Sequence, residues 1–352
     1  MDLPEGPTGV IWDITYACPL RCFHCYSESG RRPSRQLSRP DLLRVADGLA
    51  SLRPYLVTFA GGEPLLVDGL VEVAERISRA GVQVGIYTGG WRLDPALAEE
   101  LGRVFDHITV SVDGASAQTH DRIRGRAGSF ERALRAATLL DETARRQRAD
   151  GSPGFRFGLD CVVTRSNRHE MERFCTSVAS RFEQLDAVSF GAAVPSGLAS
   201  RPEFAEHELL TDEQLAEFGD GRLVERLRQL APPSVEVTVT DNLELRMDPE
   251  LLAANPDFRP LQVEPDGQVR AMPIYEGTVG SLLDEPAMVL WQRAVHRWSD
   301  EFVVRTLAPV RSVRQWAAAT RALDHHFGTA AVRARMARRP VFVPDPVLPV
   351  SA

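Results

Sequence analysis

GVIWDITYACPLRCFHC, residues 9–25, joins a β-branched run to three of the chain's five cysteines. The run VIWDIT, residues 10–15, predicts a strand because it is short and rich in β-branched residues. Cys18, Cys22 and Cys25 follow it, and Pro19 constrains the turn between them. Three sulfurs that converge on one ligand at this spacing need a loop rather than a helix face. The stretch therefore predicts a strand that ends in a metal-binding loop.

Similar short runs recur along the chain, and amphipathic helical patterns separate them. Five of them predict further strands, at 55–59, 82–87, 107–112, 155–164 and 187–194. Ser38, Asp94 and Asn167 stand where intervening helices are predicted to begin. Strands joined by helix-length connections pair in parallel through right-handed crossovers. Six such units are too few for a closed barrel, so we expect an α/β fold, a partial (β/α)6 TIM-like barrel, with its site at the carboxyl ends of the strands.

Charge and cysteine count narrow the class of function. A net charge of -7 and a pI near 5.7 argue against a protein that binds nucleic acid. The N-terminus lacks the features of a secretory signal, and no stretch reaches the ~18 apolar residues of a membrane span. We therefore expect a cytoplasmic protein without a membrane partner. Five cysteines, three of them within eight positions, indicate metal or redox chemistry rather than a disulfide framework.

The cysteine spacing distinguishes between two kinds of metal site. A zinc site needs four ligands, usually given as two pairs about a dozen or more residues apart. The C-x3-C-x2-C spacing supplies three, and Cys161 and Cys175 have no close partner. A [4Fe-4S] cluster explains the deficit, since three thiolates hold three irons and leave the fourth to a ligand that is not protein. A non-catalytic zinc-binding module, completed by a distant residue, is the alternative.

CPLRCFHC, residues 18–25, resembles the C-x3-C-x-Φ-C signature of the radical S-adenosylmethionine (radical SAM) superfamily. The resemblance implies a [4Fe-4S] cluster bound by Cys18, Cys22 and Cys25, with SAM on the open iron. An electron from the cluster, supplied by a donor such as flavodoxin or ferredoxin, would cleave SAM to methionine and a 5'-deoxyadenosyl radical. That radical would take a hydrogen atom from the substrate, while the protein positions the atoms and excludes water.

Further motifs of the family stand at the next predicted strand ends, in the family's order. Gly61-Gly62-Glu63-Pro64 resembles the GGEP motif, whose backbone and glutamate receive the SAM amino group. Taken alone, this stretch is more typical of a strand-to-helix turn. Thr88 opens a Thr-Gly-Gly sequence where relatives usually have Thr-Asn-Gly.

The later strand ends complete the implied SAM site. Ser111 and Asp113 match the family's S-x-D-G motif near the SAM ribose and carboxylate. Arg124 matches an arginine that pairs with that carboxylate, although a solvated surface arginine is an equal reading of Arg124 alone. The other implied SAM contacts are Tyr26, Thr164, Asn167, Pro195 and Gly197.

The pattern changes after about residue 232. VEVTVT and LQVEPDGQVRAM predict antiparallel strands with a turn at Asp266-Gly267. This part resembles the SPASM or twitch region of the branch that includes the mycofactocin maturase and the pyrroloquinoline quinone peptide-linking enzymes. Met272 stands where that pattern has a cysteine, and no cysteine follows Cys175, so we expect a single cluster.

Four segments make up the predicted organisation. They are a core barrel (9–231), a small α+β degenerate SPASM- or twitch-like region (232–300), a C-terminal helical segment (301–340) and an extended tail (341–352).

Two other cysteines and one histidine require an interpretation. Cys161 lies mid-strand, where it is either a small buried hydrophobe or a hydrogen-atom donor to a substrate radical. Asp160 and Cys161 point to opposite faces of that strand, so at most one of them faces the barrel interior. We expect Cys175 in the core, and His24 to pack within the loop rather than bind the cluster.

The predicted function is that of a radical SAM enzyme, an oxidoreductase or maturase of natural-product biosynthesis. A ribosomally made precursor peptide is the preferred substrate, with a separate peptide-recognition protein as a further partner. The alternative is a small natural-product intermediate, such as an aminosugar or nucleoside, which an epimerase or dehydrogenase would convert. The missing auxiliary-cluster cysteines favour this alternative.

Overall fold

The computed structural model describes residues 5–344, whose strands form one ten-stranded sheet. The order across the sheet is β10-β9-β8-β1-β2-β3-β4-β5-β6-β7. β7 and β10 are therefore its two edges, and the barrel is open. The strands are β1 (Gly9–Thr15), β2 (Leu56–Gly61), β3 (Gln83–Thr88), β4 (His107–Ser111), β5 (Arg156–Val163), β6 (Ala187–Ala192), β7 (Glu236–Thr240), β8 (Pro260–Val263), β9 (Gln268–Arg270) and β10 (Thr278–Ser281).

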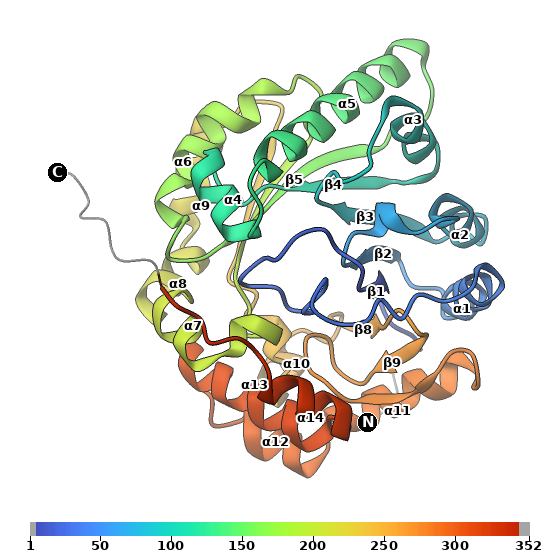
Figure 1. The fold of residues 1–352 in the computed structure, drawn as a ribbon, viewed down its shortest axis with the longest axis vertical. Coiled ribbons are helices and arrows are strands. Elements are labelled where there is room, and N and C mark those ends of the chain that lie inside the picture. The colour runs from blue at the N-terminus through green and yellow to red at the C-terminus, as the bar shows by residue number, and fades with distance from the viewer. Residues whose placement is uncertain (1–4, 345–352) are drawn as a thin grey trace.

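The strands from β1 to β7 pair in parallel with their neighbours, and helices cover the outer side of the sheet (Figure 1). Side chains of Ser38 and Asp94 cap the first helical turns that follow them. These helix starts and the six predicted strands are confirmed. The helices are α1 (Arg39–Ser51), α2 (Leu70–Ser78), α3 (Pro95–Val104), α4 (Ala117–Arg124), α5 (Ser129–Asp150), α6 (Met171–Arg173), α7 (Pro202–His207), α8 (Asp212–Gly219), α9 (Gly221–Leu230), α10 (Pro249–Ala254), α11 (Ala287–Trp298), α12 (Glu301–Leu307), α13 (Val313–Phe327) and α14 (Ala330–Ala337).

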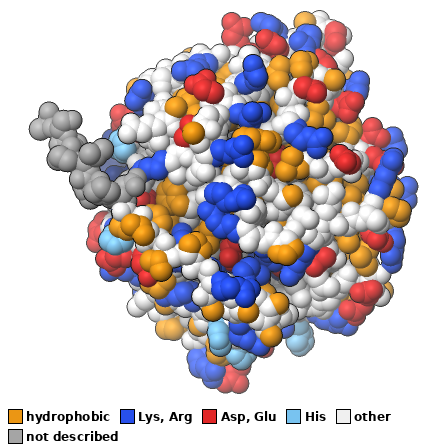
Figure 2. Space-filling view, viewed as in Figure 1, with side chains coloured by type: hydrophobic (Ala, Val, Ile, Leu, Met, Phe, Trp, Pro, Cys, Tyr) orange, Lys and Arg blue, Asp and Glu red, His pale blue; other side chains and the backbone are white. Residues whose placement is uncertain are grey.

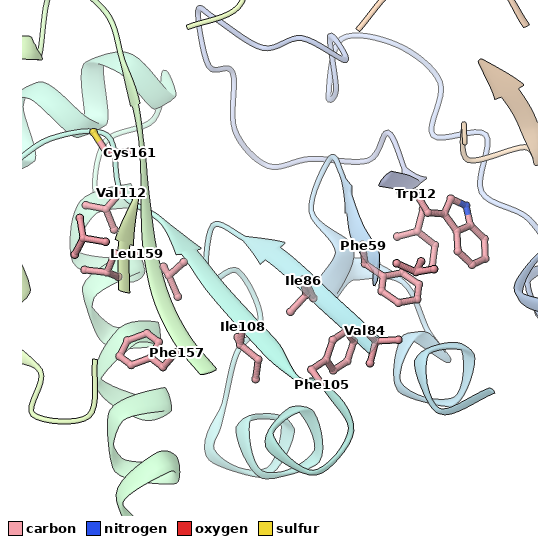
Figure 3. Close-up of a cluster of buried hydrophobic side chains, with 14 of the residues drawn as sticks. Trp12, Phe59, Val84, Ile86, Phe105, Ile108, Val112, Phe157, Leu159 and Cys161 are labelled. Carbon is pink, nitrogen blue, oxygen red and sulfur yellow. The ribbon is translucent and has the colours of Figure 1, made fainter. Parts of the chain in front are cut away.

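Side chains alternate along the parallel strands between an apolar outer face and a polar inner face. The outer face packs against the helices and forms the main hydrophobic core (Figure 3), with members that include Trp12, Phe59, Ile86, Ile108, Phe157 and Leu159. The inner face carries hydroxyls and carboxylates in adjacent register positions, such as Ser111 beside Asp160 and Asp160 beside Ser189. Burial of the outer face stabilises the sheet and leaves a polar interior.

The strand direction predicted for VEVTVT is wrong. β7 lies parallel to β6, because α7, α8 and α9 form a helical crossover that returns the chain in the same direction. β8 pairs in parallel with β1, so the sheet extends past the first strand. The antiparallel β8–β9 hairpin is confirmed, with Gly267 at a φ of 79° in its turn.

The C-terminal part forms a second hydrophobic cluster around α12 and α13. Met272, which replaces the expected cysteine, is 3% exposed and packs in this cluster with Met247, Tyr275 and Trp316. Within residues 5–344 no helix is long and apolar enough to cross a membrane. The predicted tail, 341–352, falls mostly outside the described residues.

Candidate active site

The cysteine loop starts at the carboxyl end of β1. Cys18, Cys22 and Cys25 are all free thiols, and Cys22 is buried. Burial raises the pKa of Cys18 and of Cys22 to about 12, and Cys25 contributes to the rise in both. Arg124 acts in the opposite direction on Cys22, because it hydrogen-bonds the thiol and favours its ionised form. The structure therefore brings three thiols and one guanidinium together.

Asp113, just past β4, is the centre of a buried network beside this loop. Its Oδ2 lies 2.6 Å from Arg124 Nε and 3.0 Å from His24 Nε2, and its Oδ1 accepts from the Val162 amide at 3.0 Å. Burial alone would raise the pKa of Asp113, but Arg124 and His24 hold it below its ordinary value. The network ties the cysteine loop, α4 and β5 to one carboxylate.

Arg124 is thus neither a solvated arginine nor free of protein partners. Its side chain is 11% exposed, and its guanidinium is paired with Asp113. Burial lowers the pKa of Arg124, but Asp113 and then Cys22 outweigh this effect and raise it. Contact with a SAM carboxylate stays a prediction; the structure shows Arg124 paired with Asp113 and beside the Cys22 thiol.

Glu63 joins the ends of β2 and β3. Its carboxylate is 1% exposed and accepts from Thr88 Oγ1 at 2.6 Å, from the Gly89 amide at 2.9 Å and from the Leu65 amide at 3.2 Å. Burial raises the pKa of Glu63 to about 7, while these donors act against the rise. Glu63 therefore orients the GGEP and Thr-Gly-Gly turns toward each other.

Two glycines serve the packing of the cysteine loop. A Cβ on Gly62 would lie 2.1 Å from the Ala17 carbonyl oxygen, and one on Gly197 would lie 2.1 Å from that of Tyr26. Gly197 has a φ of 52°, and the next amide, that of Leu198, donates to the Cys25 carbonyl at 3.0 Å. The close approach that these glycines allow is thus to the cysteine loop itself.

Tyr26 extends this loop toward the C-terminal part of the sheet. Its hydroxyl donates to Asp13 Oδ1 at 2.5 Å, and Gln262 Nε2 donates to Asp13 Oδ2 at 2.8 Å. Gln262 also accepts from the Ile274 amide at 2.9 Å. Asp13 and Gln262 were not predicted as site residues, and Asp13 connects the cysteine loop with β8.

The end of β5 carries the last predicted strand-end pair. Asn167 Oδ1 accepts from the Thr164 amide at 2.8 Å, and Asn167 Nδ2 donates to the Asp113 carbonyl at 3.1 Å. Thr164 Oγ1 is buried and has no hydrogen-bond partner among the described residues. Pro195 is also buried, next to the segment that packs on the cysteine loop.

The outer side of the cysteine loop contacts the C-terminal helices. Glu28, 4% exposed, lies 2.8 Å from Arg339 Nη2 and 3.1 Å from Arg335 Nε. Arg335 also pairs with Glu276, which in turn contacts the buried Arg270. Burial would raise the pKa of Glu28, but Arg339 and Arg335 lower it. We call Glu28, Arg335 and Arg339 the C-terminal clasp.

Comparison with known proteins identifies the barrel. The model of the Radical SAM superfamily matches residues 12–172. This part of the chain is therefore similar to the radical SAM superfamily. The mycofactocin maturase of Mycobacterium tuberculosis (strain CDC 1551 / Oshkosh) is 34% identical over 179 residues, 51% of this chain and 43% of that protein. An AdoMet-dependent heme synthase of Methanosarcina barkeri is 31% identical over 199 residues, 55% of this chain and 53% of that protein.

A solved structure shares the fold over more of the chain. Streptococcus suis SuiB bound to S-adenosylmethionine has a TM-score of 0.62 with 12% identity, and the match covers 86% of this chain and 68% of SuiB. The chain spans about half the length of the curated relatives it matches.

Several features of the site fit a radical SAM cluster and its SAM. The loop offers three free, neighbouring thiols, and Thr164 Oγ1 offers an unpaired buried hydroxyl at a strand end. Within residues 5–344, no three His, Cys, Asp or Glu side chains are grouped so that they could hold a metal ion. The fit therefore rests on the number of the thiols and on their freedom from disulfides.

Cys161 lies on the outer face of β5. It is 3% exposed and belongs to the main hydrophobic core, close to Val112 and Leu159 (Figure 3). Asp160 takes the opposite, interior face, next to Ser189. Because a hydrogen-atom donor must face the substrate, this position favours the other interpretation of Cys161, a small buried hydrophobe, and the donor role stays a prediction. Cys175, 0% exposed, lies in the core as predicted.

Proposed function

We propose that the chain is an enzyme that binds one [4Fe-4S] cluster at Cys18, Cys22 and Cys25 and cleaves SAM reductively. When bound, the cluster and SAM supply a 5'-deoxyadenosyl radical that abstracts hydrogen from the substrate. The observation that carries the proposal is the position of three free thiols at the carboxyl end of β1, beside Asp113 and Arg124. Ligand sites of (β/α) barrels lie at these strand ends.

The surrounding residues have separate roles in this proposal. Arg124 offsets the negative charge of the thiolates, and Asp113 holds Arg124 and His24 in place. Glu63 fixes the two turns that would receive SAM. The predicted SAM contacts at Ser111, Thr164 and the other strand ends belong to the same proposal.

The polar inner face of the sheet favours a substrate site inside the barrel. Ser111, Asp160 and Ser189 lie side by side there and are only half-buried, and Tyr87 on β3 is 43% exposed. Hydroxyl and carboxylate groups in a partly solvated interior suit a substrate that forms hydrogen bonds. Water leaves this face when such a substrate binds, which protects a radical reaction.

We take a ribosomal precursor peptide as the preferred substrate. The mycofactocin maturase is named for maturation, and SuiB has a structure with its precursor peptide SuiA. Met272 and its apolar neighbours fill the place where the relatives of this branch would carry auxiliary-cluster ligands, which supports one cluster. A small natural-product intermediate is the second candidate, because a heme synthase is among the relatives.

Anaerobic reconstitution tests the enzyme. We expect about four irons and four sulfides per chain, and 5'-deoxyadenosine from SAM with dithionite. Cys22→Ala should lose both, while Cys175→Ala, whose thiol lies in the core, should keep both. Zinc without SAM cleavage would show that the site is a zinc-binding module instead. Mass spectrometry then separates the two substrate classes, with a precursor peptide encoded by a neighbouring gene or with small molecules made by the enzymes that neighbouring genes encode.

A further inference from the structure

An arginine-lined cleft of about 290 Å³ lies between α14 and the segment that follows the third cysteine. Six arginines and one glutamate line it, although the whole chain has a net charge of -7. Figure 2 shows arginine side chains gathered over the middle of the face where that segment and α14 meet. The charge of this cleft is thus opposite to that of the chain.

Three of the six arginines are already compensated. Arg335 and Arg339 bind Glu28 in the C-terminal clasp. Arg35 lies 3.0 Å from Glu264 and 3.3 Å from Asp266. These arginines therefore stabilise the loop and do not need an outside anion.

The other three, Arg31, Arg32 and Arg338, form no ion pair with an acidic side chain in the part of the chain that is described. Arg32 stacks over Tyr16 at 3.8 Å, and its Nη2 is buried without a hydrogen-bond partner among those residues. Burial lowers the pKa of Arg32 and Arg335 acts in the same direction, whereas Tyr16, Glu276 and Glu264 act against the fall. A bound anion would offset the positive charge of Arg335 at this position.

We propose that this cleft binds an anionic ligand of phosphate or carboxylate type through Arg31, Arg32 and Arg338. The planar guanidinium groups match the oxygen pairs of phosphate and carboxylate, and each can bind such a group with two hydrogen bonds. Arg32 Nη2 supplies an unused buried donor at the base of the cleft, and Arg31 and Arg338 supply exposed charge at its rim. The ligand is either a small phosphate-bearing molecule or an acidic peptide segment.

The cleft lies beside the cysteine loop, so a ligand bound in it would act on the proposed radical SAM site. Arg31 and Arg32 follow Cys25 within the same loop, whereas Arg338 lies just past α14. An anion held by all three therefore joins the cysteine loop to the C-terminal helices. Because the ligand binds the folded arrangement only, it should raise the melting temperature.

Calorimetric titration of the full, cluster-reconstituted chain tests the site. Inorganic pyrophosphate probes the phosphate type, and a hexaglutamate peptide probes the carboxylate type. We expect saturable binding of at least one probe, weakened by added salt, with a matching rise in melting temperature. The probe that binds more tightly identifies the ligand type.

The variants are chosen at exposed positions so that the fold persists. Arg31→Gln with Arg338→Gln should weaken binding about tenfold or more. Arg103→Gln with Arg173→Gln removes the same charge from exposed positions on α3 and α6 and should leave binding unchanged. Failure of both probes to bind the unaltered chain, or equal binding to both double variants, overturns the proposal. The readout requires no SAM cleavage, so it is separate from the test of the enzyme.

Discussion

The cysteine loop is held by two buried carboxylates that differ in the origin of their partners. Asp113 binds Arg124 and His24, all three within the first half of the barrel. Glu28 binds Arg335 and Arg339, which are 307 and 311 residues away in the sequence. In both supports, arginines lower the pKa of the carboxyl group, although burial alone would raise it. The comparison shows one support built from the family motifs and another, the C-terminal clasp, built from a distant helix.

Removal of Asp113 should have the largest effect. Asp113→Ala leaves the Arg124 side chain, 11% exposed, without its carboxylate and deprives the Val162 amide of its acceptor. Breaking a buried pair from one side costs about 3–5 kcal/mol, so we expect a loss of this size in urea unfolding followed by circular dichroism. Iron incorporation should fall with it.

Asp113→Asn provides the matched control for that change. The amide keeps an oxygen for the Val162 amide, so the loss of stability should be smaller than for alanine. A loss below about 1 kcal/mol for Asp113→Ala, the size typical of exposed pairs, would mean that Asp113 does not organise the loop.

Glu28→Ala tests the C-terminal clasp in the same way. Among the described residues, the Arg339 side chain, 6% exposed, then keeps a contact with Ser200 Oγ at 3.2 Å, so we expect a loss of about 3 kcal/mol, at the lower end for a broken buried pair. The reconstituted chain should also lose iron to a chelator faster. Glu301→Ala, in an exposed pair with Arg305, should change stability by less than about 1 kcal/mol. Equal losses of stability for Glu28→Ala and Glu301→Ala would mean that the C-terminal clasp does not support the cysteine loop.

The two supports also differ in how far sequence could predict them. Strand periodicity, the caps at Ser38 and Asp94, and the motif order predicted the barrel and placed Asp113 at a strand end. The partners of Glu28 could not be predicted, because local pattern does not specify which distant charges meet. The same limit explains the direction of β7, since pairing depends on the crossover before the strand and not on its own residues.

Glu63 is a third buried carboxylate, which receives hydrogen bonds but pairs with no arginine within residues 5–344. Its pKa is raised from 4.5 to about 7, whereas those of Asp113 and Glu28 are lowered. The folded chain thus binds the Glu63 proton more tightly than the unfolded chain does. The resulting stabilisation, roughly 3 kcal/mol at 1.36 kcal/mol per pKa unit, is complete below about pH 4.5 and is lost as the pH rises through 7.

Glu63→Gln should remove this part of the pH dependence. Glutamine stays neutral, so the unfolding free energy of the variant, measured in urea from about pH 5 to pH 8, should fall less steeply than that of the unaltered chain. Glu75→Gln, at a partly solvated position on α2, is the matched control and should leave the slope unchanged. Parallel slopes for the chain and Glu63→Gln would mean that the hydrogen bonds from Thr88 and Gly89 offset burial completely. The absence of a cation would then not be what separates Glu63 from Asp113 and Glu28.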